Sequence, residues 1–315
     1  MSANRSRPSL ALLVALLAAL PGSPSHADDG LPVTTLIGLS LPSRARAAAW
    51  TSLAGPLWSK SGPSPDDVFQ GDLDDCALLA RMIGLAAHRP EQLMHSLVER
   101  PDGRIAVTLF PPPSRAKVEL LVDRRVPTKD GRPLFAGTSA PAFASDLARE
   151  FAASGTRPIW PAILEKAVAA LYGGYAALDG ERIDQRAALD GSREFTIWLP
   201  DAPPAASASA LREALALGLS VELGNADPER AHAAGVRPAH AYAVLGAREV
   251  DGVFRLQLRE PLGANEATSN AGVTELGGSD ALSLFRWMGI GGGDWSSMKS
   301  LAALPGKPGI RDGSR

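Results

Sequence analysis

The sequence of 315 residues contains a single cysteine, Cys76. A lone thiol excludes an intramolecular disulfide and any zinc or iron–sulfur site built from several cysteines. Aromatic residues make up only 5% of the chain, so we expect the core to depend on Leu, Val and Ala. The 32 basic and 34 acidic residues leave a net charge of −2, a balance that gives no overall basic field for nucleic acid.

The N-terminus has the order of features that is typical of a secretory signal peptide. Arg5 and Arg7 precede an apolar run over residues 10–20, and small residues follow at 25–27. The run is shorter than the roughly 20 residues that a membrane-spanning helix needs. We therefore expect export and removal of residues 1–27, which predicts a secreted or periplasmic protein with no stable membrane anchor. An uncleaved anchor helix is the alternative.

The remaining chain divides by composition and hydrophobic pattern. We expect a lead-in with little periodicity, a helical lobe that carries Cys76, a lobe rich in strands, and a loose tail. Their respective ranges are 28–64, 65–200, 201–295 and 296–315. The stretch 201–209, rich in Pro and Ala, is interpreted as the connector between the lobes.

Local periodicity predicts the individual elements. Helices are expected over residues 76–88, 90–99, 160–172 and 210–217. Strands are expected over residues 104–110, 117–126, 195–199, 220–223, 241–247 and 253–259. The fold class is thus α+β with two lobes, and a cleft between lobes is a usual place for an active site.

Cys76 lies where a loop becomes a helix. In an oxidising compartment a lone cysteine is either buried and inert or kept for its chemistry. A thiolate at a helix start is stabilised by unpaired backbone N–H groups, whereas the nearby Asp72, Asp74 and Asp75 oppose its formation. A cationic partner is therefore needed, and histidinium is the obvious candidate. The amide of Gln70, on the incoming loop, could donate to an oxyanion.

The segments around these residues resemble the calpain family of papain-like cysteine proteases. The family's cysteine motif reads Gln-Gly-x-Leu-Gly-Asp-Cys-Trp-x-Leu-Ala, and Asp74 and Ala77 depart from it by replacing Gly and Trp. Four further segments resemble family motifs in the same order. They are Val122-Asp123-Arg124-Arg125-Val126-Pro127, Trp160-Pro161-Ala162-Ile163-Leu164-Glu165-Lys166-Ala167, Ala239-His240-Ala241-Tyr242, and Arg259-Glu260-Pro261-Leu262-Gly263.

The resemblance implies a two-lobed papain-like fold and a role for each site residue. Cys76 would be the nucleophile, His240 the general base and acid, and Gln70 the oxyanion donor. The family orients the histidine with Asn, where this chain has Glu260. A carboxylate can also accept the imidazole N–H. The alternative is that Glu260 is a solvent-exposed charge at a strand end. Leu262 replaces a Trp that shields this pair in the family.

These observations favour a secreted, calpain-like cysteine endopeptidase that acts on protein or peptide substrates through a thioester on Cys76. The alternative is a catalytically impaired protein that uses the fold as a binding module, and a third hypothesis is acyl transfer to an amine. No cofactor is predicted, and no metal site follows from the residue pattern. Calcium enters only through the resemblance, because family members can bind it in the core.

Overall fold

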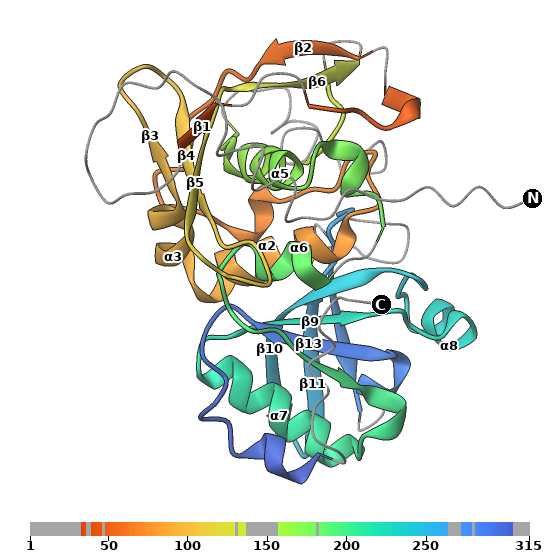
Figure 1. Cartoon of the computed structure of the whole chain (residues 1–315). Coiled ribbons are helices and arrows are strands. Elements are labelled where there is room, and N and C mark those ends of the chain that lie inside the picture. The colour runs from red at the N-terminus through yellow and green to blue at the C-terminus, as the bar shows by residue number, and fades with distance from the viewer. Residues whose placement is uncertain are drawn as a thin grey trace, which may run out of the picture.

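The computed structural model describes residues 33–35, 39–45, 48–129, 132–136, 157–180, 183–263, 272–278 and 281–304. These residues form both helices and strands, and all but one of the strand pairs are antiparallel, so the expected α+β class is confirmed (Figure 1). Residues 1–27, the predicted signal peptide, lie outside the described ranges. No helix within those ranges combines the length and apolarity needed to cross a membrane.

The first half of the chain places helices against two small sheets. Its helices are α2 (Cys76–His88), α3 (Pro90–Ser96), α5 (Trp160–Leu171) and α6 (Ile183–Ala187). One sheet has the order β1-β5-β4-β3, and the other has the order β2-β6-β7. Their strands are β1 (Val33–Thr35), β2 (Ala49–Ser52), β3 (Leu97–Glu99), β4 (Ile105–Leu109), β5 (Val118–Val122), β6 (Arg125–Lys129) and β7 (Arg132–Pro133).

The second half forms a six-stranded antiparallel sheet with the order β12-β11-β10-β9-β13-β8. The strands are β8 (Phe195–Trp198), β9 (Ser220–Gly224), β10 (Ala241–Val250), β11 (Val253–Arg259), β12 (Val273–Gly277) and β13 (Trp287–Gly291). Asp251 and Gly252 join β10 to β11 with φ angles of 52° and 72°, as a two-residue hairpin turn requires. Two helices accompany this sheet, α7 (Pro204–Ala216) and α8 (Pro228–Ala233).

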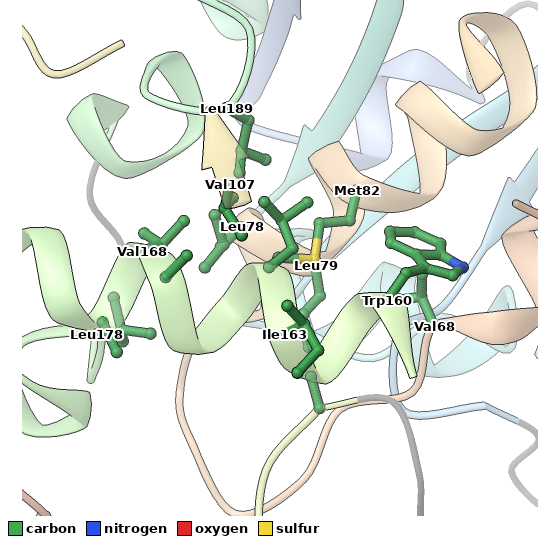
Figure 2. Close-up of a cluster of buried hydrophobic side chains, with 14 of the residues drawn as sticks. Val68, Leu78, Leu79, Met82, Val107, Trp160, Ile163, Val168, Leu178 and Leu189 are labelled. Carbon is green, nitrogen blue, oxygen red and sulfur yellow. The ribbon is translucent and has the colours of Figure 1, made fainter. Parts of the chain in front are cut away.

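The helices α2 and α7 pack on opposite faces of this sheet, as the alternation of side chains along β10 shows. Ala241 and Ala243 belong to the hydrophobic cluster that contains α2, whereas Tyr242 and Val244 belong to the cluster that contains α7. Successive residues of a strand point to opposite faces, so one strand joins both cores. Figure 2 shows part of the first cluster, where Leu78 and Leu79 of α2 meet Ile163 of α5.

A buried ionic cluster ties α2 to the same sheet. Arg81 of α2 donates to both carboxylate oxygens of Glu222 on β9, at 2.7 and 2.8 Å. Its other contacts are Asp190 at 3.1 Å and Glu194 at 3.5 Å, and none of these side chains is more than 2% exposed. Removing one member would leave buried charges without a partner, so the cluster fixes the helix against the sheet.

Several elements differ from their predicted ranges. The expected connector 201–209 is largely helix, because α7 begins at Pro204 and proline is favoured in a first helical turn. The expected strand 117–126 is two strands, β5 and β6, separated where Asp123 accepts a bond from the backbone N–H of Arg125. The helix predicted for 90–99 ends at Ser96, and β3 follows it directly.

Two broader expectations are also corrected. The helical lobe predicted for 65–200 also contains six strands, β3 to β8, among its described residues. The tail predicted to be loose contains a short 3-10 helix over Ser300–Ala303, which the Glu213 carboxylate of α7 holds. That carboxylate accepts from the backbone N–H groups of Lys299 and Ser300 at 2.9 and 2.7 Å. Remaining 3-10 turns are Ser43–Ala45, Pro65–Asp67, Tyr175–Ala177, Leu199–Asp201 and Leu282–Leu284.

Candidate active site

Cys76 is the first residue of α2 and is partly exposed, so it is not the fully buried cysteine of the inert alternative. The loop before it is held closely against residues 134–135. A Cβ on Gly71 would lie 2.2 Å from the Leu134 carbonyl oxygen and 2.6 Å from the Phe135 Cα. The backbone N–H of Asp72 also donates to Leu134, at 2.8 Å. Only glycine fits this approach, which fixes the path of the chain into the helix.

Gln70 joins the cysteine loop to the loop that carries Glu260. Its backbone N–H donates to the Pro261 carbonyl at 2.8 Å. Its side chain is buried, and its Nε2 donates to the Leu73 carbonyl at 2.6 Å. An amide nitrogen carries two hydrogens, and the bond to Leu73 engages one of them within the loop itself.

Asp75 and Glu165 form a buried pair of carboxyl groups directly beside Cys76. Asp75 directly precedes α2 without a side-chain capping bond, and Glu165 reaches it from α5. Burial raises the pKa of Asp75 to about 7, and burial with the charge of Asp75 raises the pKa of Glu165 well above its ordinary value. Two such groups in contact are stable when they share a proton. In its protonated form Asp75 opposes a thiolate on Cys76 less than an ionised carboxylate at the same place would.

His240 lies immediately before β10 at a strained position in the backbone. The preceding Ala239 has a φ of 52°, in the left-handed region that favours glycine. The backbone N–H of Asn225 donates to the His240 carbonyl at 3.0 Å and anchors the turn. Burial, followed by the positive charge of Arg237, lowers the pKa of His240 to about 4. The imidazole is therefore neutral at pH 7, and the predicted histidinium is not the resting form.

Glu260 is fully buried, so the alternative of a solvent-exposed charge is wrong. Its Oε1 accepts from the Nε of Arg237. The same oxygen lies 3.8 Å from the Nε2 of His240, which is beyond hydrogen-bond length. Glu260 thus faces His240 as the resemblance implies, but its hydrogen bond goes to Arg237.

Tyr242 is an aromatic neighbour of His240 in the site. Its ring meets the imidazole edge to face, with centroids 5.5 Å apart. Burial raises the pKa of its phenol, and the charges of Glu260 and Cys76 raise that pKa further. Cys76 is thus within electrostatic range of the strand that follows His240, and the packing of α2 on β10 brings the two elements together.

The four predicted site residues therefore come from three neighbouring loops. The sequence analysis missed Arg237, Glu165 and Tyr242. Arg237 could have been found, because a buried carboxylate at position 260 requires a cation and Arg237 lies three residues before His240. Ala77, which replaces a family tryptophan, is buried in the first core, and Leu262 is partly buried.

Among the residues that the structure describes, no group of three or more His, Cys, Asp or Glu side chains is placed to hold a metal ion. Asp67, which lies upstream of the cysteine loop, bonds instead to the Trp160 indole at 2.8 Å and to the Ser64 backbone at 2.8 Å.

Comparison with known proteins identifies the family of the chain. The family described as calpain family cysteine protease matches residues 45–272. Calpain-8 of Mus musculus is 31% identical over 236 residues, which is 68% of this chain and 30% of that protein. The calpain-2 catalytic subunit of Bos taurus is 32% identical over 232 residues, again 68% of this chain and 30% of the relative. The match thus spans about a third of each relative's length.

Proposed function

Because the chain belongs to the calpain family of cysteine proteases, we propose that it is an active endopeptidase that hydrolyses peptide bonds through a thioester on Cys76. The observation that carries the proposal is the convergence of three loops. Cys76 lies at the start of α2, Gln70 bonds to the loop of Glu260, and Glu260 faces His240. We also propose that the two cores are the two lobes of a papain-like fold, with the substrate bound between them.

The residues suggest a sequence of proton transfers. A neutral imidazole on His240 takes the Cys76 proton as the sulfur attacks the peptide carbonyl carbon, giving a tetrahedral oxyanion. The second hydrogen of the Gln70 amide and the backbone N–H groups at the start of α2 donate to that oxyanion. The imidazolium returns the proton to the amine as the C–N bond breaks, which leaves a thioester. Water, activated by the same imidazole, then hydrolyses the thioester and restores the thiol.

The direct test is cleavage of a denatured protein by the purified mature chain. We expect cleavage by wild type and a loss of about a thousandfold or more in Cys76→Ala and His240→Ala. His95→Ala is the matched control, since His95 is exposed on α3. Cleavage by Cys76→Ala at the wild-type rate would refute a thioester mechanism.

A second candidate function is that of a binding module without turnover, which the bond between Glu260 and Arg237 favours. His240 Nε2 is buried without a hydrogen-bond partner among the described residues, and the acid that should orient it bonds to Arg237. This function predicts that Cys76→Ala retains peptide binding and that wild type shows no single-turnover product.

We further propose export to the periplasm or the medium, based on the signal-like residues 1–27. The test is the N-terminal mass of the protein recovered from the extracytoplasmic fraction of cells that express the full chain. A new N-terminus after Ala27 is the expected result, and recovery of the intact N-terminus in the cytoplasmic fraction would contradict export.

A further inference from the structure

Two groups at the site compete for one oxygen atom. The Oε1 of Glu260 accepts from Arg237, and the same atom lies 3.8 Å from the Nε2 of His240. The Nε2 is buried and lacks a hydrogen-bond partner within the described part of the chain. A buried nitrogen left in this state costs free energy, and the Glu260 oxygen 3.8 Å away from it already accepts from Arg237.

Arg237 and His240, the two groups that compete for the Glu260 oxygen, differ in how freely they can move away from it. The Glu260 carboxylate is fully buried and the His240 side chain is only 8% exposed, whereas the Arg237 side chain is 40% exposed. The backbone of Arg237 is held, because its N–H donates to the Tyr242 hydroxyl at 2.6 Å. The guanidinium can therefore move toward solvent while its loop stays in place beside the site.

The charges at the site favour the same exchange. The buried carboxylate of Glu260 needs a positively charged or hydrogen-bonding partner wherever Arg237 goes. Arg259 donates to the backbone carbonyl of Glu260 at 2.7 Å, and the imidazole of His240 lies 3.8 Å from the carboxylate. The charge of Arg237 also disfavours protonation of His240. Moving that charge away would strengthen the bond of the imidazole to Glu260.

We propose that Arg237 is a substrate-responsive positioning residue: a carboxylate of the substrate near the scissile bond pairs with Arg237 and frees Glu260 to accept a hydrogen bond from His240. The inference rests on the proposed peptidase function and deepens it. It names the substrate class as acidic peptides, because the anion that draws Arg237 away from Glu260 belongs to the substrate. The carboxylate is that of an Asp or Glu side chain or of a chain terminus.

Alkylation of Cys76 tests the response of Arg237 to a carboxylate without any peptide substrate. Iodoacetate and iodoacetamide transfer similar groups to the thiolate with loss of iodide, but only iodoacetate carries a carboxylate. Since Cys76 is the only cysteine, the product mass reports one site. The measurement is the ratio of the two second-order rate constants, because effects on the intrinsic reactivity of the thiol largely cancel in that ratio.

We expect the iodoacetate preference of wild type to fall by about tenfold in Arg237→Gln and to persist in Arg237→Lys, which keeps the charge. Arg248→Gln is the matched control, because Arg248 is exposed near the far end of β10 and pairs with Glu275. Equal ratios in wild type and Arg237→Gln would overturn the proposal. An equal fall in Arg248→Gln would also overturn it, since the effect would then come from net charge.

Peptide cleavage supplies the second arm and separates the two claims. Paired peptides with Glu or Gln beside the cleaved bond, and with a free or amidated C-terminus, identify which carboxylate is recognised. We expect kcat/KM to favour one acidic member by about tenfold in wild type and by much less in Arg237→Gln. Cleavage that requires Cys76 but shows no acidic preference in either enzyme overturns the inference and leaves the peptidase standing. Absence of all cleavage, with the Arg237-dependent alkylation ratio intact, overturns the peptidase and supports carboxylate capture by Arg237.

Discussion

The two sides of the candidate site are stabilised in different ways. The cysteine side is fixed by close packing at Gly71 and by a carboxyl pair, Asp75 and Glu165, that is stable when it holds a proton. The histidine side is fixed by charge, since Glu260 is buried against Arg237 and the Nε2 of His240 has no hydrogen-bond partner among the described residues. The cysteine side keeps most of the family's residues, and the histidine side departs from them. The difference indicates that the catalytic state is decided on the histidine side.

The largest expected effect comes from disrupting the buried ion pairs of Arg81, which hold α2 against the sheet that carries the histidine side. Arg81→Met leaves Glu222 and its acidic neighbours buried without their main cation, so we expect a loss of about 3–5 kcal/mol in the free energy of unfolding. Arg100→Met is the control, because its pair with Glu119 is 44% exposed on the arginine side and should contribute less than about 1 kcal/mol. Urea denaturation of both variants measures the difference. Equal losses would show that the buried cluster does not join the two sides.

Packing on the cysteine side is tested next. Gly71→Ala forces a methyl group against the Leu134 carbonyl, and we expect a loss of about 3 kcal/mol with slower alkylation of Cys76. Gly246→Ala, whose added Cβ meets nothing closer than 3.8 Å, should leave both quantities near wild type. A Gly71→Ala protein as stable and as reactive as wild type would contradict the packing argument.

The pH dependence of stability separates the two sides, because their contributions have opposite signs. The pKa of Asp75 is about 7 in the folded state, so its stabilising contribution is present below about pH 4 and is lost as the pH rises through 7. The pKa of His240 is lowered to about 4, so its contribution is present above about pH 6.5 and is lost as the pH falls through 4.

Asp75→Asn removes the first contribution and keeps the second. We expect the stability of this variant relative to wild type to rise by about 3 kcal/mol between pH 4 and 7. Asp201→Asn controls for loss of one exposed carboxylate. Chemical denaturation across this pH range gives the curves, and a constant difference between Asp75→Asn and wild type would show that the carboxyl pair does not hold the extra proton.

The smallest expected effect concerns the backbone of the histidine side. Ala239→Gly relieves a left-handed residue and should stabilise the protein by about 1 kcal/mol. Ala247→Gly, within the regular part of β10, should instead cost about 0.5–1 kcal/mol. Thermal unfolding measures both signs, and destabilisation by Ala239→Gly would refute the strain at this position.

Much of the fold followed from local pattern, and its failures have local causes. The period of the apolar residues predicted α2 with its observed bounds, and the β10–β11 hairpin was found from its two strands and its Asp251-Gly252 turn. The connector prediction failed because proline and alanine were interpreted as breakers, although a proline in the first turn starts α7. The pairing of β8 with β13 depends on long-range contact and leaves no local signal.

The candidate site was predictable in its parts but not in its charges. The motifs predicted Gln70, Cys76, His240 and Glu260, and the structure brings Gln70 and His240 next to the loop of Glu260. The bond between Arg237 and the Glu260 oxygen could not be predicted, because it depends on the fold of the loop before His240. The burial that lowers the pKa of His240 depends on the same loop. The proton held by Asp75 and Glu165 could not be predicted either, because the pair forms only where α5 packs beside the start of α2.

The central claim is that His240 activates Cys76, and the rate of alkylation by iodoacetamide as a function of pH tests it most directly. We predict that wild type reacts at least about tenfold faster than His240→Ala at pH 6–7 and that the two rates converge above pH 9, where the thiol ionises without help. Superimposable profiles for the two proteins across the whole range would contradict the account.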